Sequence, residues 1–160
     1  MRALVVTVST RASRGEYADT SGPVIADGLR AMGFQTDGPE IVPDGPEIEN
    51  VLLGAVHAGY DVVITTGGTG LSPSDVTPEH TLNVISREVP GIAEAVRAAG
   101  LAKGVPTSAL SRGVAGLAGD TLIVNLPGSA GGARDGMVVL GGVLAHAVEQ
   151  VRGGDHPRTT

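Results

Sequence analysis

Short runs of aliphatic and β-branched residues constrain the fold of this chain most strongly. Residues 3–8 read Ala-Leu-Val-Val-Thr-Val, and residues 61–66 read Asp-Val-Val-Ile-Thr-Thr. Neither run alternates between polar and apolar residues, which is typical of strands that are buried on both faces of a sheet. We therefore predict two central strands of a parallel sheet, and such a sheet needs helices on both of its faces.

Helical segments separate these strands along the chain. One helix, which closes near Gly59, is indicated by apolar residues at positions i, i+3, i+4 and i+7: Ile48, Val51, Leu52 and Ala55. The last helix is predicted to be continuous, with one apolar face formed by Met137, Leu140, Leu144, Ala147, Val148 and Val151. Further helices are predicted over 24–32, from 77 and over 91–103, a weaker strand over 35–43, and two short strands over 114–118 and 121–126.

Strands separated by helices of this length indicate βαβ units. The fold class is therefore a single-domain, three-layer αβα protein with a mostly parallel central sheet. We assign residues 1–152 to this domain and residues 153–160 to a flexible C-terminal tail. Ligands of such folds bind beyond the carboxyl ends of the strands, so we expect the functional site in the loops that follow the strands.

The composition excludes several classes of protein. The chain has 11 Lys and Arg against 17 Asp and Glu, a net charge of −6, whereas binding a nucleic-acid backbone requires positive charge. Two Tyr, one Phe and no Trp are too few for base stacking, and the absence of Cys excludes disulfides and thiolate metal sites. No apolar stretch approaches the roughly 18 residues that span a bilayer, and no signal peptide is recognisable, so we expect a cytoplasmic protein without membrane contact.

A glycine-rich loop, Thr65-Thr66-Gly67-Gly68-Thr69-Gly70, follows the strand at 61–66. Glycines let main-chain N–H groups turn toward an anion and let a phosphate approach closely, but tight turns also use glycine for purely steric reasons. Two common nucleotide motifs are absent. There is no P-loop, because the single lysine, Lys103, is followed by Gly104 and Val105, and the Rossmann glycine spacing ends at Pro73.

Two aspartates are candidate metal ligands beside this loop. Asp75 precedes Thr77-Pro78, which already supply an N-cap and a first helical turn, so Asp75 is free to bind Mg²⁺ or to be a solvated loop residue. Asp44 follows what we take to be a neighbouring strand, although Pro43-Asp44-Gly45 is also an ordinary turn sequence. On adjacent strand ends, the two carboxylates are expected to share one Mg²⁺ ion, which offsets their repulsion of a polyphosphate.

The remaining loop candidates are less specific. Ser129 is either the N-cap of the last long helix or part of a second anion site at its N-terminus. The arginines expected near the loops are Arg11, Arg14, Arg87, Arg112 and Arg134. The four histidines lack metal-ligand spacing, and only His80 lies near the loop in sequence.

Four sequence blocks together resemble the MogA/MoaB family of molybdenum cofactor biosynthesis. They are Thr66-Gly67-Gly68-Thr69-Gly70, Asp75-Val76-Thr77-Pro78-Glu79, Leu110-Ser111-Arg112-Gly113 and Asn125-Leu126-Pro127-Gly128. Val8-Ser9, Pro43-Asp44 and the spacing between the blocks extend the resemblance over residues 3–150.

The resemblance implies a molybdopterin adenylyltransferase, usually homotrimeric, that transfers AMP from Mg-ATP to the terminal phosphate of molybdopterin and releases pyrophosphate. The adenylylated product then passes to a MoeA-type molybdenum insertase. By position, the resemblance implies that Asp75 and Asp44 are catalytic and bind Mg²⁺. It also implies a nucleotide and phosphate loop at Gly67, Gly68, Thr69 and Gly70, with further pocket positions at Ser111, Asn125, Pro127 and Gly128.

The sequence departs from the family at two places. Ser9-Thr10 stands where many relatives have Ser-Asp, which removes one acidic group. Ser72-Pro73-Ser74 replaces a basic spacer, which leaves Arg112 or Arg14 to contact the phosphates. Two other functions therefore stay open: a carrier that binds molybdopterin without adenylylating it, which the Ser9-Thr10 departure favours, and a hydrolase of a phosphoanhydride, which phosphate release without molybdopterin would indicate.

Overall fold

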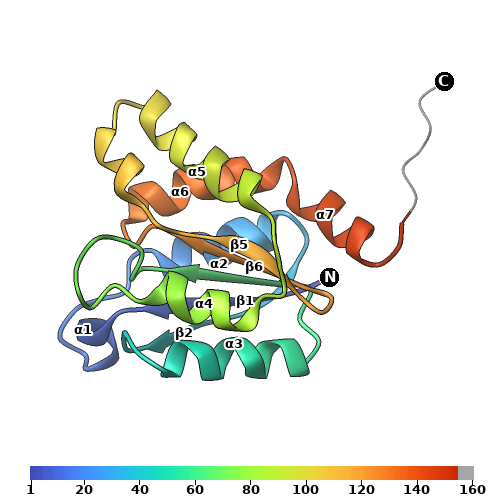
Figure 1. Ribbon diagram of the computed structural model, residues 1–160, viewed down its shortest axis with the longest axis horizontal. Coiled ribbons are helices and arrows are strands. Elements are labelled where there is room, and N and C mark those ends of the chain that lie inside the picture. Colours follow the sequence, from blue (N-terminus) through green and yellow to red (C-terminus); the bar gives the residue numbers. More distant parts are fainter. Residues whose placement is uncertain (155–160) are drawn as a thin grey trace.

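The computed structural model describes residues 1–154, so most of the tail assigned to 153–160 lies outside the described residues. Helices and strands alternate along the chain (Figure 1). The strands are β1 (Arg2–Val8), β2 (Gln35–Val42), β3 (Val62–Thr66), β4 (Arg87–Glu88), β5 (Ala115–Ala118) and β6 (Thr121–Leu126). The helices are α1 (Thr10–Ser13), α2 (Gly22–Ala31), α3 (Glu47–His57), α4 (Thr77–Val84), α5 (Pro90–Ala102), the 3₁₀ helix η1 (Pro106–Leu110), α6 (Ala130–Gly141) and α7 (Leu144–Val151).

The strands form one sheet in the order β2-β1-β3-β6-β5-β4. The first four are parallel to their neighbours, whereas β5 runs antiparallel to β6 and β4 antiparallel to β5. The predicted mostly parallel sheet and the hairpin over 114–126 are confirmed. β1 lies between β2 and β3, so the expectation that Asp44 follows a strand adjacent to β3 is wrong. The two-residue β4 was not expected, because Arg87 and Glu88 carry no apolar pattern.

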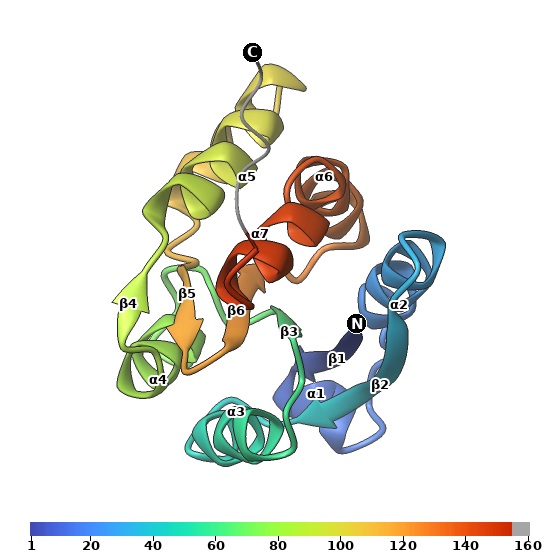
Figure 2. The same ribbon diagram turned by 90° about the vertical axis from the view of Figure 1, so that its right-hand side faces the viewer.

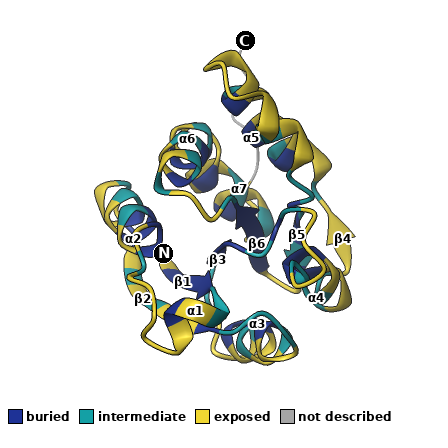
Figure 3. Ribbon diagram, turned by 90° about the vertical axis from the view of Figure 1, so that its left-hand side faces the viewer, coloured by how far each residue is buried: buried dark blue, intermediate teal, exposed yellow. Residues whose placement is uncertain are grey.

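Helices cover both faces of the sheet, which confirms the three-layer αβα class (Figure 2). Side chains alternate along each central strand: Val5 and Ile64 pack against α2, α5, α6 and α7, whereas Leu4 and Val63 pack toward α3 and α4. The central strands β1, β3 and β6 are therefore buried on both faces, while the outer surfaces of the helices are exposed (Figure 3).

The C-terminal helix is interrupted, contrary to the expectation of one continuous helix. α6 ends at Gly141, Gly142 follows it, and α7 begins at Leu144. The predicted apolar face survives the break, because Met137, Leu140, Leu144 and Val148 are all buried in the same core cluster. Two successive glycines have a low helix propensity, so tertiary packing can break the helix there at little cost.

A short helix was also missed in the segment that follows β1. No helix was predicted between residues 9 and 19, but α1 begins at Thr10, and the hydroxyl oxygen of Ser9 accepts a hydrogen bond from Ala12 N as its N-cap. None of the helices within residues 1–154 has the length and apolar character needed to cross a membrane.

A polar contact joins α3 to α4, the helix that follows the glycine-rich loop. Asn83 Nδ2 donates to Glu49 Oε2 (3.0 Å), and His80 Nδ1 lies 3.2 Å from the same oxygen. The bonds from Asn83 and then His80 hold the pKa of Glu49 below its usual value. His80, the one histidine expected near the loop, is therefore bound to the neighbouring helix.

We predict that Glu49→Gln lowers the free energy of unfolding at pH 7, and that this difference shrinks as the pH falls. A carboxyl group whose pKa is lowered by folding stabilises the protein above its unfolded pKa, and that contribution is lost as the pH falls through its folded pKa. Urea unfolding of both proteins between pH 7 and pH 3 measures the effect. Glu94→Gln, on the exposed face of α5, is the control; a difference for Glu49→Gln that is unchanged at pH 3 would contradict the prediction.

Candidate functional site

The loops that follow the parallel strands meet at one edge of the sheet. The loop after β3 lies at the centre of this edge, between the segments that follow β1 and β6 (Figure 1). Gly67 N donates to Leu126 O (3.2 Å), and Thr66 Oγ1 donates to Pro127 O (2.7 Å), which ties this loop to the end of β6. The glycine-rich loop is therefore built into the sheet edge.

The start of α4 is tied to the same loop. Thr77 N donates to Gly68 O (3.1 Å), and Thr77 Oγ1 donates to Gly67 O (2.9 Å). Val76, and not Thr77, occupies the N-cap position, so the predicted capping role of Thr77 is wrong. The Thr77 hydroxyl instead fixes the glycine-rich loop, which needs a donor because a loop carbonyl at this position has no strand partner.

Gly67 and Gly68 adopt a backbone that side chains rarely tolerate, with φ of +99° and +63°. A Cβ atom at Gly67 would lie under 3.0 Å from Val8 O, and one at Gly68 under 3.0 Å from Thr77 Oγ1. Among residues 1–154, the main-chain N–H groups of Gly68, Thr69 and Gly70 donate no hydrogen bond. The loop thus presents three free donors, which is the arrangement that binds phosphate oxygens.

The two candidate carboxylates lie against this loop, that of Asp44 beside Gly68 and that of Asp75 beside Gly70. Ideal Cβ positions at Gly68 and Gly70 lie 2.9 Å from Asp44 Oδ1 and 2.8 Å from Asp75 Oδ2. The loop therefore brings together two acidic residues whose strands are not neighbours. Only glycine at 68 and 70 leaves room for them.

Asp75 and Asp44 are each held by one oxygen. Asp75 Oδ2 accepts from Ser72 N (3.0 Å), and within residues 1–154 its Oδ1 accepts no hydrogen bond. Asp44 Oδ2 accepts from Thr10 N (3.1 Å) and Thr10 Oγ1 (2.9 Å), and Asp44 N donates to Thr10 Oγ1 (3.1 Å). One oxygen of each carboxylate thus has no hydrogen-bond donor within residues 1–154.

A cavity of about 500 Å³ opens beside the loop, between it and the helices α5, η1 and α6. Its lining includes seven of the predicted binding positions together with Asp75: Gly67, Gly68, Thr69, Gly70, Ser111, Pro127 and Gly128. Its far wall is formed by Val96, Arg97, Gly100, Val105, Thr107, Ser108, Leu110, Ser129, Gly131, Gly132 and Asp135. The cavity therefore joins the glycine-rich loop to a mixed wall, in which the apolar side chains of Val96 and Leu110 accompany the charged side chains of Arg97 and Asp135.

A second cavity of about 310 Å³ lies on the other side of the loop. It shares Gly67, Gly128 and Ser129 with the first cavity and is otherwise lined by the end of β1, the segment between β1 and α2, and Thr66 of β3. Arg11 lines it and lies over the ring of Tyr17, 5.3 Å from the ring centre. Two ligands can therefore meet at the glycine-rich loop from opposite sides.

Asn125 and Asp44, two predicted site residues, do not line the larger cavity. Asn125 is buried, donates from Nδ2 to Thr65 Oγ1 (2.9 Å) and Thr81 Oγ1 (3.0 Å), and accepts from Val114 N (3.1 Å). Its side chain therefore joins β3, β6 and α4 and has no donor left for a ligand. Ser129 is the N-cap of α6, since its hydroxyl oxygen accepts from Gly132 N (3.0 Å).

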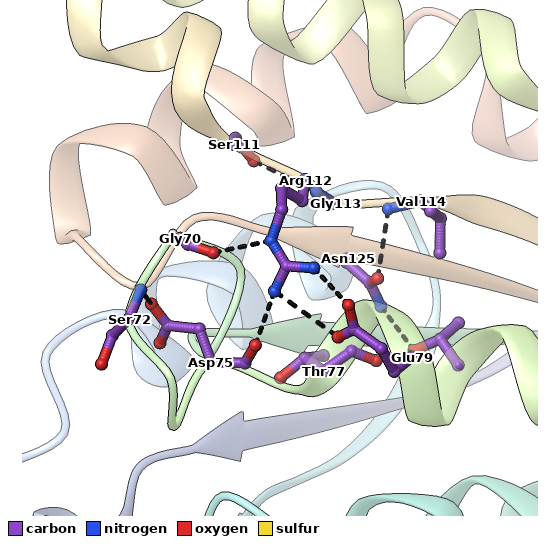
Figure 4. Close-up of polar contacts among 11 residues, drawn as sticks. Gly70, Ser72, Asp75, Thr77, Glu79, Ser111, Arg112, Gly113, Val114 and Asn125 are labelled. Atoms are coloured by element: carbon purple, nitrogen blue, oxygen red, sulfur yellow. Dashed lines mark hydrogen bonds and ion pairs between the residues drawn. The ribbon is translucent and has the colours of Figure 1, made fainter.

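The arginines differ from the sequence expectation. Arg112 Nε donates to Gly70 O (2.8 Å), its Nη2 donates to Asp75 O (2.6 Å), and its Nη1 is paired with Glu79 (Figure 4). These bonds bind Arg112 to the protein itself, and its guanidinium holds the pKa of Glu79 below the usual value. Of the other expected cations, Arg14, Arg87 and Arg134 are exposed and line neither cavity.

Arg97 is the cavity residue that sequence reasoning missed. It lies on α5, lines the larger cavity, and donates from Nη1 to Gly113 O (3.0 Å) and Ser111 O (3.3 Å). The signal was present in the sequence, because Arg97 lies four residues after Ala93 and three before Gly100, on the buried face of an otherwise apolar helix. A charged residue on such a face needs a polar partner or a site.

Fold and site together define an α/β domain with a glycine-rich loop and a cavity at the carboxyl ends of its parallel strands. Residues 4–146 match the family described as a probable molybdopterin binding domain, and the chain belongs to this family. The MogA/MoaB resemblance is thereby confirmed.

Individual relatives support this assignment. A molybdopterin adenylyltransferase of Helicobacter pylori strain J99 is 36% identical over 156 residues, which cover 93% of this chain and 86% of the relative. A solved structure of MogA is 55% identical with a TM-score of 0.92, covering 94% of this chain and 99% of the other. MoaB from Thermus thermophilus is 48% identical with a TM-score of 0.88, covering 95% and 96%. The chain spans about half the length of the bifunctional molybdenum cofactor biosynthesis proteins that it also matches, at 50% and 48%.

We predict that Gly68→Ala destabilises the protein more than Gly59→Ala. Both glycines have a positive φ, +63° and +72°, so both substitutions carry the left-handed backbone cost of roughly 1–2 kcal/mol. Only at Gly68 would the new Cβ also meet Thr77 and Asp44, whereas nothing lies within 4 Å at Gly59. We expect an additional loss of about 1–3 kcal/mol in the free energy of unfolding, measured with urea. Equal losses for the two variants would show that the contacts at Gly68 impose no constraint.

Proposed function

We propose that this protein is a molybdopterin adenylyltransferase, which transfers AMP from Mg-ATP to molybdopterin and releases pyrophosphate. The observation that carries the proposal is the loop with three free N–H groups at Gly68, Thr69 and Gly70, flanked by the carboxylates of Asp44 and Asp75. The name and near-complete coverage of the Helicobacter relative support the same activity.

The two cavities suit a reaction between two bound substrates. Because they share Gly67, Gly128 and Ser129, ligands in each of them approach one another at the loop. Holding two reactants in contact replaces an encounter in solution and supplies much of the rate enhancement in such transfers. The chain need supply no covalent nucleophile for this step.

The chemistry is a phosphoryl-type substitution at the α-phosphorus of ATP. An oxygen of the molybdopterin phosphate attacks this phosphorus, the bond to the bridging oxygen of the β-phosphate breaks, and pyrophosphate leaves with the electron pair. The attacking phosphate is already ionised at neutral pH, so no general base is required. The loop N–H groups donate to phosphate oxygens, where they stabilise the charge that develops in the transition state.

The residues present fit a Mg²⁺ ion bound together with ATP. Mg²⁺ in such sites takes one or two carboxylates and completes its shell with phosphate oxygens and water. Asp75 and Asp44 each keep one carboxylate oxygen available beside the loop, and residues 1–154 contain no cluster of three or more His, Cys, Asp or Glu that would suggest another metal. When bound, the ion supplies positive charge that offsets the repulsion between these carboxylates and the phosphates.

A carrier of molybdopterin that lacks the transfer activity is a second candidate, because Thr10 occupies one oxygen of Asp44 from both its N–H and its hydroxyl. Tight molybdopterin binding without pyrophosphate release would favour it. For either function we propose a homotrimer in the cytoplasm that passes adenylylated or unmodified molybdopterin to a MoeA-type insertase. The trimer corresponds to about three times the 16.0 kDa chain mass, which light scattering measures directly.

We predict that Asp75→Asn lowers molybdopterin-dependent pyrophosphate release from Mg-ATP by at least about 100-fold, because it removes a proposed ligand of the Mg²⁺ ion that offsets the charge of the phosphates. Asp120→Asn, in the exposed turn between β5 and β6, is the matched control and should keep wild-type turnover. The assay is run with and without molybdopterin, and urea unfolding verifies that both variants are folded. Substantial turnover by folded Asp75→Asn would exclude the catalytic role of Asp75.

A further inference from the structure

We propose that Arg112 is a positioning residue, which holds the glycine-rich loop and Asp75 in place for the reaction instead of binding a phosphate. The inference rests on the proposed adenylyl transfer and deepens it. It starts from the position of Arg112, whose guanidinium lies among Gly70, Asp75 and Glu79 (Figure 4).

Arg112 bonds to both ends of the segment from Thr69 to Asp75. Its main-chain N donates to Thr69 O (2.8 Å) and its Nε to Gly70 O (2.8 Å), at the end of the glycine-rich loop. Its Nη2 donates to Asp75 O (2.6 Å), at the other end of the segment. One residue therefore fixes the distance between the free N–H groups and the Asp75 carboxylate.

Nothing else of comparable strength holds the stretch between these ends. Residues 71–74 are all exposed, and Leu71 keeps 65% of its surface accessible, so no core packing orders them. Within the turn, Ser72 N donates to Asp75 Oδ2 and Asp75 N donates to Ser72 O (2.9 Å). This turn sets the direction of the carboxylate, whereas Arg112 sets the place of the turn.

Glu79 directs the guanidinium from the first turn of α4. Both Nη1 and Nη2 of Arg112 contact its carboxylate, and Glu79 lines neither cavity. With the bonds to Gly70 and Asp75, all three guanidinium nitrogens are engaged with the protein. Four of its five N–H groups thus have protein acceptors, and the Glu79 carboxylate beside them would repel a phosphate.

Glu79 makes it possible to distinguish by experiment between a positioning role and a phosphate-binding role of Arg112. As an exposed carboxylate outside both cavities it cannot bind a phosphate, so its removal affects turnover only through Arg112. The test uses Arg112→Gln, Arg112→Lys, Glu79→Gln and the double variant Arg112→Gln/Glu79→Gln, assayed for molybdopterin-dependent pyrophosphate release. The matched controls are Arg30→Gln and Asp27→Asn, which break the exposed ion pair between Arg30 and Asp27 on α2.

We expect each single variant at Arg112 or Glu79 to lower kcat by at least about tenfold, with the KM for Mg-ATP changed less than about threefold, because misplacing a catalytic group acts on the chemical step. The double variant should be no slower than the slower single variant, since both substitutions remove one device. Arg112→Lys should behave like Arg112→Gln, because an ammonium group cannot reach three acceptors in a plane.

Hydrogen exchange provides a readout that does not depend on turnover. The amide hydrogens of Ser72 and Asp75 should exchange about tenfold faster in Arg112→Gln and in Glu79→Gln, while those of β3 are unchanged. If wild-type protein shows no adenylyl transfer, the proposed function fails. Whatever the turnover, unchanged amide exchange of Ser72 and Asp75 in both variants would overturn the positioning role. A raised KM in both Arg112 variants with a normal Glu79→Gln enzyme would instead show that Arg112 binds phosphate.

Discussion

The close approach of the glycine-rich loop to the strand beside it is the constraint on which the site depends. At Gly67 the loop passes so near Val8 O that no Cβ fits, and the ideal Cβ of Gly128 lies 3.0 Å from the Cα of Gly67. This contact brings the ends of β1, β3 and β6 together, so that loops from three strands share one surface. The carbonyls of the loop accept hydrogen bonds from Thr77 and Arg112, whereas its N–H groups at residues 68–70 have no acceptor within residues 1–154.

The layers of the fold could be predicted from the sequence because each central strand is buried on both faces. The few polar positions of such strands are buried threonines, such as Thr7, Thr65 and Thr66, so the strands at 3–8 and 62–66 are visible as runs of aliphatic and β-branched residues. The errors occurred where apolar periodicity does not decide the structure. α7 continues the apolar face of α6 after the chain bends at Gly142, and periodicity alone cannot distinguish a bent helix from a straight one.

The candidate site could be predicted only as far as local motifs extend. The loops that contain Gly67, Asp75 and Gly128 were identified because parallel strands place their carboxyl ends on one edge. The partners of each polar side chain depend on contacts between segments distant in sequence. Asn125 was expected to bind a ligand but bonds Thr65 and Thr81, and Arg97 reaches the cavity from a helix that the motifs do not include.

In the candidate site, the arginine side chains donate to the protein itself, whereas, within residues 1–154, main-chain N–H groups of the glycine-rich loop stay free. A site for polyanions is expected to contain free cations. Here, however, Arg97 and Arg112 donate hydrogen bonds to carbonyl oxygens, and Lys103 is paired with Asp135. Main-chain N–H groups bind phosphate without adding flexible charge, and their direction is fixed by the fold. Arginines that hold carbonyls make that direction precise, because five donors in one plane can fix several main-chain oxygens at once. On the proposed function, Arg97 and Arg112 therefore shape the surface that would bind the anion, and the main chain would provide the donors.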